Sequence, residues 1–307
     1  MSKKISIFLV AFVSIIVVSM IGCSALQPQR IVHQLPPSQF ENKAWNEIFS
    51  RKAQIDSFKI LTTGSVKVPL GGVLNKDKLQ LDHGLTESLW VDVFVFLFHH
   101  EKKGWFMIDT GLDSTFQKKG NIKGLLAGNF IKDTRQNKSQ NIKAQLEKEN
   151  KKIEGIFLTH LHGDHTAGLP EIDSSIPKYI AKGEKYLNVP LIYSSNHLSK
   201  KDTLRELDWE SASAIFPLEA VIDLFGDGSF FGIHTPGHSN SHLSYLLVTD
   251  EGPILLTGDV SHTKYGFVNK IEPGWVDNQA LAVNSLKQLV KFYEIYPDIR
   301  VIFGHER

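Results

Sequence analysis

The chain has 307 residues, enough for one or two domains, and 42% of them are hydrophobic, which is sufficient for a packed core. Its 34 lysines and arginines are balanced by 33 aspartates and glutamates, and the formal net charge is +1. This balance argues against the strongly basic surface that a nucleic-acid-binding protein presents to its partner. The sequence therefore excludes nucleic acid from the expected partners.

Residues 1–22 are predicted to be a signal peptide. Two lysines at positions 3 and 4 precede an almost continuous apolar run over residues 5–21. The segment Met20-Ile21-Gly22-Cys23 resembles the lipobox of bacterial lipoproteins, in which the chain is cut before a cysteine that is then lipidated. The alternative is an uncleaved N-terminal anchor helix. In either case the remainder of the chain is expected to be exported.

Cys23 is the only cysteine, so the mature chain has no disulfide and no thiolate metal ligand. For an exported protein with one cysteine at the end of an apolar run, lipidation is a better explanation than packing. We therefore expect a lipid on Cys23 to hold the protein on the surface of a bacterial membrane, on its periplasmic or cell-surface side.

Residues 23–57 are predicted to be a tether with a short helix, and residues 58–307 to be the folded domain. Ser24–Ser38 has no hydrophobic periodicity, as in a linker, whereas Phe40–Phe58 has apolar residues at roughly helical spacing. Two strand-like runs, Trp90–Phe98 and Trp105–Ile108, then predict a hairpin. The histidines at positions 99 and 100 are expected in its solvated turn.

The second half of the chain alternates helical and strand-like patterns. Helices are predicted over residues 139–151, 203–214 and 278–293. Strands are predicted over residues 153–158, 221–224, 230–234, 243–249, 253–257 and 300–303. This order favours an α+β fold in which two mixed sheets pack together with helices outside.

Three imidazoles and one carboxylate, those of His160, His162, Asp164 and His165, occur within six residues after a predicted strand. Imidazole nitrogen and carboxylate oxygen are ligands for Zn²⁺ and similar ions. His160 and His162 are two residues apart, whereas Asp164 and His165 are adjacent and point in different directions. The segment therefore predicts two metal sites; the alternative is a polar surface loop that happens to be rich in histidine.

Further candidate ligands follow other predicted strands. His238 ends the sequence Thr-Pro-Gly-His, Asp259 follows a glycine, and His305 also follows a glycine. Side chains at strand ends can converge at one edge of a sandwich, where loops carry function on a rigid frame. These three residues are therefore expected to join the histidine-rich segment.

Taken together, the motifs resemble the metallo-β-lactamase-fold hydrolase superfamily. They occur in the order Asp109-Thr110-Gly111, H-x-H-x-D-H at residues 160–165, T-P-G-H ending at His238, G-D ending at Asp259 and G-H ending at His305. The resemblance implies an αββα sandwich with two divalent metal ions, zinc being the expected metal. It also implies that one ion is held by His160, His162 and His238, the other by Asp164, His165 and His305, and that Asp259 bridges them.

The N-acyl-homoserine-lactonase-like branch is the most similar part of that superfamily. Residues 158–169, the His238 and His242 doublet, and the segment from Gly274-Trp275 to His305 carry this likeness. Those lactonases usually have tyrosine three residues after the bridging aspartate, where this chain has His262. His262 is expected either to donate a hydrogen bond to the substrate or to be a solvent-facing loop residue. His242 is expected to support the ligands rather than to be one of them.

The expected activity is hydrolysis of an ester-type bond in a small-molecule substrate, with a lactone as one candidate. Asp164 is the candidate catalytic residue, because a carboxylate at the metals can carry a proton to the leaving group. A thioester hydrolase and a persulfide dioxygenase remain alternatives, although their thiol cofactor is mainly intracellular. His162 disfavours the flavodiiron oxidoreductases, which have glutamate there. The alternative outside enzymes is a surface lipoprotein that binds metal without turnover.

Overall fold

The computed structural model describes residues 27–40, 43–80, 82, 84–124, 127–187 and 197–307. The predicted signal peptide and Cys23 lie outside the described residues. Within the described ranges, no helix is both long enough and apolar enough to cross a membrane.

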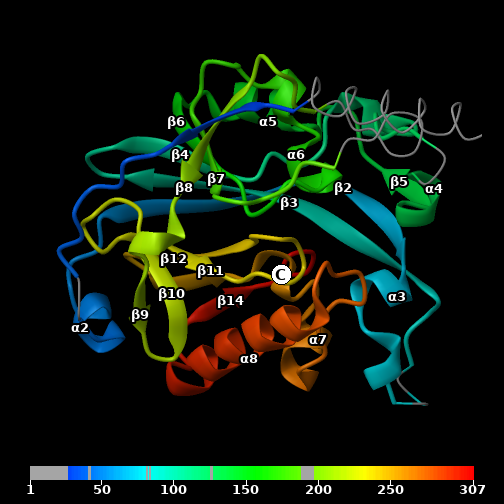
Figure 1. The fold of residues 1–307 in the computed structure, drawn as a ribbon. Coiled ribbons are helices and arrows are strands. Elements are labelled where there is room, and N and C mark those ends of the chain that lie inside the picture. Colours follow the sequence, from blue (N-terminus) through cyan, green and yellow to red (C-terminus); the bar gives the residue numbers. More distant parts are fainter. Residues whose placement is uncertain (1–26, 41–42, 81, 83, 125–126, 188–196) are drawn as a thin grey trace, which may run out of the picture.

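Two layers of strands lie face to face between helices (Figure 1). The first layer has the order β1 (Gln29–Val32), β8 (Thr203–Leu207), β7 (Lys178–Ala181), β6 (Ile153–Phe157), β4 (Gly104–Ile108), β3 (Ser88–His100) and β2 (Ile55–Pro69), with β5 (Asp133–Arg135) also on β2. The second has the order β14 (Arg300–Ile302), β13 (Gly252–Leu256), β12 (Leu243–Thr249), β11 (Phe230–His234), β10 (Leu218–Asp223) and β9 (Ser213–Ile215). Both layers combine parallel and antiparallel pairs, and among the described residues strand pairing joins them at Thr249 of β12 and Ile55 of β2.

Aromatic side chains fill the space between the two layers. The Phe98 ring from β3 lies 4.7 Å from the Phe230 ring of β11, and the Phe157 ring from β6 lies 4.9 Å from the same ring. On the opposite face of β3, Val95 and Leu97 are also fully buried. A strand buried on both faces has an almost uninterrupted apolar sequence, as β3 does.

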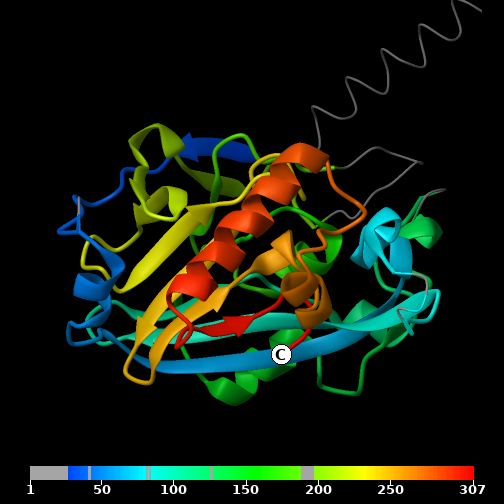
Figure 2. The same ribbon diagram turned by 90° about the horizontal axis from the view of Figure 1, so that it is seen from below.

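Helix α8 (Gln279–Ile295) crosses the outer face of the second layer (Figure 2). It begins at Asn278, whose side chain accepts a hydrogen bond from the backbone N–H of Leu281, and its Leu289 and Phe292 are buried against that sheet. Helix α5 (Ile142–Glu149) lies outside the first layer, where Ile142 is buried. The layers therefore run helix, sheet, sheet, helix, as the sequence predicts.

The helix predicted over residues 203–214 is wrong. This segment forms β8, a 3₁₀ turn at Trp209–Ser211 and β9. β8 is paired on both sides, in parallel with β1 and β7, and its Leu204 and Leu207 are completely buried. Strand pairing and burial outweigh the helix propensity of the leucine, arginine and glutamate in this run.

The turn assigned to the first hairpin is also corrected. β3 and β4 pair antiparallel as predicted, but β3 extends through His100. The His100 side chain is completely buried, and its Nε2 lies 2.9 Å from Oδ2 of Asp227, in the turn between β10 and β11. His100 is therefore a structural contact between the layers rather than a solvated turn residue.

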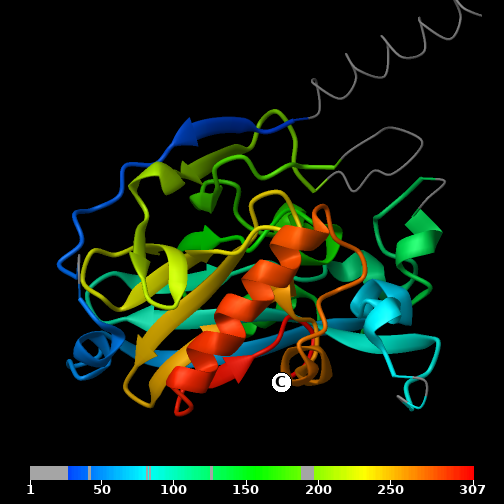
Figure 3. The same cartoon turned by 60° about the horizontal axis from the view of Figure 1, so that its bottom comes forward.

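The segment before the first sheet is more ordered than a linker. Residues 29–32, expected within a tether, form β1 beside β8 (Figure 3). The helix predicted over Phe40–Phe58 is confined to α2 (Trp45–Phe49), because Ile55 already begins β2. Trp45 is completely buried, 5.2 Å between ring centroids from Phe231 and from Phe292. In the N-terminal segment, β1 thus extends the first layer, whereas α2 packs on the second layer and α8.

Replacing Trp45 with alanine should lower the free energy of unfolding by about 3–5 kcal/mol, because it removes a buried indole and leaves a cavity. Chemical denaturation measures the change. Ile31→Ala on β1 is the control: this side chain is 47% exposed, and its loss should cost about 0.5 kcal/mol or less. Equal effects of the two substitutions would show that α2 does not anchor the segment.

Candidate metal centre

All seven predicted ligands come together where strands from both layers end. His160 follows β6, and the short helix α6 (Gly163–Thr166) carries Asp164 and His165. His238 follows β11, Asp259 lies in the 3₁₀ turn after β13, and His305 follows β14. The sandwich therefore supplies the side chains from rigid strand ends, and their convergence requires both sheets.

Two groups of donor atoms are close enough to hold ions. Ligand atoms of His160, His162, His238 and Asp259 all lie within 4.8 Å of one another, and so do those of Asp164, His165 and His305. In the first group, Nε2 of His238 is 3.0 Å from Nδ1 of His162. In the second, Nε2 of His305 is 3.5 Å from Oδ2 of Asp164. This is the division that the sequence motifs imply.

Asp259 lies between the two groups. Its Oδ2 is 3.2 Å from Nε2 of His238 and 3.4 Å from Nε2 of His165, and its Oδ1 is 3.5 Å from Nε2 of His305. A carboxylate in contact with both groups can bridge two dications and offset their repulsion. The carboxylate is almost completely buried, so its position is set by the protein and not by solvent.

The donor set fits divalent metal ions. Nε2 of His160, Nε2 of His165 and Oδ1 of Asp259 are buried and have no hydrogen-bond partner in the structure. Buried polar atoms without partners are costly and uncommon. Their convergence on one place, as imidazole nitrogens and a carboxylate oxygen, is explained by cations that they coordinate. Nitrogen and oxygen donors without thiolate suit zinc among the transition metals.

The electrostatics of the cluster favour a cation. Burial, followed by the neighbouring imidazoles, lowers the pKa of His160 well below its usual value, and burial lowers that of His162 to about 3. Burial opposes the charge of Asp259, but surrounding imidazoles, His165 foremost, hold its pKa well below the usual value. His160 and His162 therefore offer free lone pairs, and Asp259 offers a negative charge.

Asp109 and Thr159 orient the ligands and were not assigned a role from the sequence. Oδ2 of Asp109 is 2.7 Å from Nδ1 of His165, while Oδ1 accepts a hydrogen bond of 2.8 Å from the backbone N–H of Thr159. Asp109 has φ of 57°, a left-handed conformation that aspartate tolerates better than most residues. A histidine ligand whose second nitrogen is held by a carboxylate has a defined tautomer and ring orientation.

Glu184 holds two of the ligand-bearing loops together. Its Oε2 accepts hydrogen bonds from the hydroxyl of Ser239 at 2.9 Å and the backbone N–H of Ser241 at 2.8 Å, just after His238. Its Oε1 faces the backbone N–H of Leu161, between His160 and His162, at 3.4 Å. No local sequence pattern indicates this role, because the residue follows β7 and its partners are far away in the chain.

His242 supports Asp259 without joining the ligands. Its Nε2 accepts a hydrogen bond of 2.9 Å from the backbone N–H of Asp259, and its Nδ1 contacts the hydroxyl of Thr235. Both ring nitrogens are therefore used. Gly258 permits this contact, because it has φ of 53° and a Cβ there would lie 2.6 Å from Nε2 of His242.

His262 faces the metal centre. It is only 8% exposed, and its Nε2 lies 3.1 Å from Oδ2 of Asp259. Its ligand atom, with those of Asp259 and His305, forms a third set within 4.8 Å. The interpretation of His262 as a solvent-facing loop residue is therefore wrong.

A largely apolar cavity of about 460 Å³ opens onto the cluster. Asp164, Asp259, His262 and His305 lie on its polar side. Its apolar wall includes Val68, Phe130, Ile131, Leu187 and Trp275. The edge of the Trp275 ring system packs so closely on Gly72 that a Cβ at Gly72 would lie 2.6 Å from it. The cavity can therefore place an apolar group beside the polar cluster.

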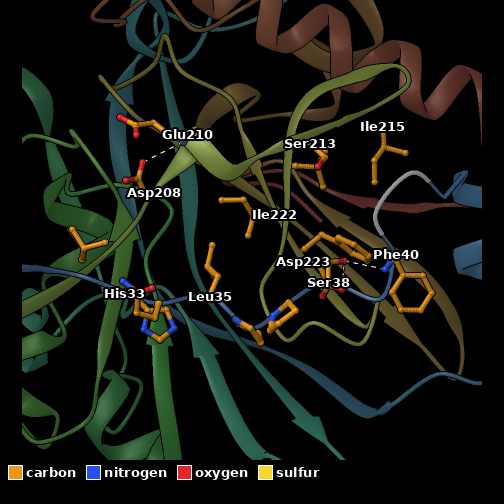
Figure 4. Close-up of a pocket in the computed structure, with 16 residues that line it drawn as sticks. His33, Leu35, Ser38, Phe40, Asp208, Glu210, Ser213, Ile215, Ile222 and Asp223 are labelled. Atoms are coloured by element: carbon orange, nitrogen blue, oxygen red, sulfur yellow. Dashed lines mark hydrogen bonds between the residues drawn. The ribbon is translucent and has the colours of Figure 1, made fainter.

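Another cavity, of about 560 Å³, lies between β10 and the segment after β1 (Figure 4). It contains the carboxylates of Asp208, Glu210 and Asp223 but none of the predicted ligands. Asp223 accepts hydrogen bonds from Ser38 and from two backbone N–H groups of the following turn. Its carboxylate thus stabilises the local fold, and the candidate active site is the cavity at the histidine cluster.

Comparison with known families identifies one match across most of the folded chain. The family model of the metallo-beta-lactamase superfamily matches residues 89–305. This range includes all seven predicted ligands together with Asp109 and His262.

Individual relatives are more distant. An N-acyl homoserine lactonase from a Bacillus species is 27% identical over 252 residues, which cover 75% of this chain and 90% of the relative. A solved N-acyl homoserine lactone hydrolase, with the product N-hexanoyl-L-homoserine at its catalytic metal centre, superposes with a TM-score of 0.64 at 20% identity, covering 82% of this chain and 94% of the other. A dizinc quorum-quenching lactonase superposes with a TM-score of 0.57 at 14% identity, covering 83% and 90%. The structural matches establish a shared fold.

Asp109→Asn should weaken metal binding by about 10- to 100-fold, the usual scale for losing a group that orients a ligand. The amide nitrogen cannot accept the hydrogen bonds that His165 and Thr159 donate to the carboxylate. Competition with a chelator, followed by metal analysis, measures the affinity.

Asp56→Asn serves as the control for this substitution. Asp56 contacts His99 at 2.6 Å on the surface, away from the cluster. The Asp56→Asn variant should therefore bind metal as tightly as the unaltered protein. Unchanged affinity in Asp109→Asn would mean that His165 does not depend on Asp109.

Proposed function

Because the chain belongs to the metallo-beta-lactamase superfamily and is a metal-dependent hydrolase, we propose that it hydrolyses the lactone ring of N-acyl homoserine lactones. The observation that carries this proposal is an apolar cavity that opens directly onto the cluster of Asp164, Asp259, His262 and His305. The similarity to an N-acyl homoserine lactonase over 90% of that relative's length supports it.

The proposed substrate matches the two sides of the cavity. The polar lactone ring lies at the histidine cluster, and the acyl chain lies against the apolar wall that includes Phe130 and Trp275. The rings of these two residues are 5.1 Å apart in an edge-to-face arrangement. Burial of an apolar chain contributes roughly 0.8 kcal/mol for each methylene group removed from water. Longer acyl chains should therefore bind more tightly until the wall is filled.

Two divalent ions would be held by the two donor groups, with Asp259 between them. When bound, such ions polarise a carbonyl oxygen and make water nucleophilic near neutral pH. The protein supplies the positions of the ligands: Asp109 orients His165, and Glu184 fixes the loops that carry His160 and His238. It also supplies the cavity that brings the ester carbon to the cluster.

Asp164 is the group that would carry a proton to the leaving oxygen. It lines the cavity, and its side chain is 22% exposed, more than that of Asp259 at 4%. Burial opposes its charge, but His165 and His305 lower the pKa of its carboxyl below the usual value. An ionised carboxylate open to the cavity can accept a proton and return it to the alkoxide of the opened ring.

A thioester hydrolase and a metal-binding lipoprotein without turnover are the competing functions. The full-length chain in detergent, loaded with zinc, should be assayed with a panel of lactone, linear ester, thioester and phosphodiester substrates. Preferred hydrolysis of acyl homoserine lactones supports the proposal, and preferred hydrolysis of thioesters contradicts it. Two bound ions without hydrolysis of any substrate would favour the binding role.

Asp259→Ala should lower the metal content and reduce lactone turnover by at least about a hundredfold, the scale on which a single catalytic group acts. The reason is that Asp259 contacts both donor groups, so neither ion keeps its full set of ligands. Metal analysis and steady-state kinetics measure the two effects. Retained metal together with unchanged turnover would end the proposal.

We also propose that a lipid on Cys23 anchors the enzyme to the outer or periplasmic face of a bacterial membrane. The support is the lipobox-like sequence and the short distance from Cys23 to the folded body. Only three residues lie between Cys23 and Gln27, so Gln27 is four positions further along the chain, and its side-chain amide donates a hydrogen bond to the backbone carbonyl of Tyr186. Four extended residues span at most about 14 Å. The anchored body would therefore stay close to the membrane surface.

Cys23→Ser should move the protein from the membrane fraction to the soluble fraction, because the thiol that would receive the lipid is lost. Fractionation of the producing cells and mass spectrometry of the N-terminal peptide measure the change. Lactone turnover by the released protein should be unaltered, since Cys23 is not one of the predicted ligands. Continued membrane association of Cys23→Ser without a lipid would favour the uncleaved anchor helix.

A further inference from the structure

The orientation of the His262 ring limits what this residue can do. Its Nδ1 lies 3.2 Å from the backbone carbonyl oxygen of Val73, in α3 (Leu70–Val73). A carbonyl oxygen only accepts hydrogen bonds, so Nδ1 carries the hydrogen and donates it. In the neutral ring, Nε2 then has a lone pair and no hydrogen. A substrate carbonyl needs a donor, which this nitrogen does not provide.

The lone pair of His262 points at another acceptor. Nε2 is 3.1 Å from Oδ2 of Asp259, and neither atom of this pair brings a hydrogen when the ring is neutral. Two acceptors that face each other at this distance need a positive charge that both can contact. A cation at the cluster satisfies both atoms.

His262 has the same arrangement as two predicted ligands. Nδ1 of His305 lies 2.7 Å from the backbone carbonyl of Asp92, and its Nε2 faces Asp259. Nδ1 of His165 is held by Asp109, and its Nε2 also faces Asp259. In metal sites, a histidine ligand almost always donates its second N–H to a carbonyl or carboxylate in this way. His242 differs, because its Nε2 already accepts the backbone N–H of Asp259.

We propose that His262 is itself a metal ligand, on the ion held by Asp164, His165 and His305. Its ligand atom lies within 4.8 Å of those of Asp259 and His305, so the set that shares His305 is the one it joins. This role is independent of which bond the enzyme hydrolyses. An ion on this side would then have one more protein ligand than an ion held by His160, His162 and His238.

Two substitutions distinguish whether His262 is a metal ligand or a hydrogen-bond donor to the substrate. His262→Ala removes both possible roles. His262→Gln keeps an amide N–H that can donate to a substrate, but a neutral amide is a poor replacement for imidazole on zinc. Each variant should therefore bind one of the two ions at least about tenfold more weakly. Loss of a group that only orients a ligand already weakens metal binding by about this factor, and loss of a ligand should cost no less. The affinity for the other ion should be unchanged.

The test uses the full-length chain in detergent and zinc alone, with no substrate. Chelator competition gives the affinity of each ion, and X-ray absorption of the zinc-loaded protein gives the mean number of imidazole neighbours per ion, which should fall in both variants. His99→Ala is the control, because His99 lies at the surface beside Asp56. Thermal unfolding in chelator checks that each variant folds.

The assignment would be overturned if His262→Ala bound each of the two ions as tightly as the unaltered protein does, with an unchanged number of imidazole neighbours per ion. So would full metal binding in both variants with lactone turnover lost in His262→Ala and retained in His262→Gln, since that pattern marks a donor to the substrate. Weak binding of one ion in both variants supports the assignment even if no lactone is hydrolysed.

Discussion

The metal centre depends on one buried carboxylate. Asp259 is 3% exposed and has imidazole nitrogens from both donor groups within 3.5 Å. Removing a charge from water is costly unless opposite charges or hydrogen bonds compensate for it. The surrounding imidazoles and the backbone contact of His242 supply part of that compensation, and two divalent ions supply the remainder. The arrangement around Asp259 therefore makes binding of the metals part of the stability of the site.

This constraint explains why two sheets are needed. The histidine-rich segment comes from the end of β6 in the first layer, whereas Asp259 and His305 come from the ends of β13 and β14 in the second. Among the described residues, strand pairing joins the layers at Thr249 and Ile55, and further backbone hydrogen bonds link Leu243 to Thr159 and Asp92 to His305. Elsewhere the aromatic core around Phe98 and Phe230 packs the two layers together. Disturbing that core would move one set of ligands relative to the other.

Sequence patterns predicted most strands and helices of the two layers, but they failed for the segment at residues 203–214 and for the end of β3. The hairpin, α5, α8 and the strands β10 to β14 have periodicities that are local and clear. The segment at residues 203–214 has helix-like spacing but forms strands, because its pairing partners, β1 and β7, are far away in the chain. The charged neighbours of His100 indicate a solvated turn, but Asp227 contacts this histidine from another hairpin and the side chain is buried. Both errors have the same cause, since contacts between distant segments decide what a short run of residues becomes.

The sequence by itself determined the chemistry of the site: seven nitrogen and oxygen donors in order, most of them directly after strand-like runs, and no cysteine among them. It did so because donor type and strand periodicity are properties of adjacent residues. Only the tertiary structure decided which groups support those donors. Asp109 meets His165, Glu184 meets Ser241, and Val73 meets His262 across 56, 57 and 189 positions of the chain. Such contacts leave no local pattern, because each one depends on how the two sheets pack.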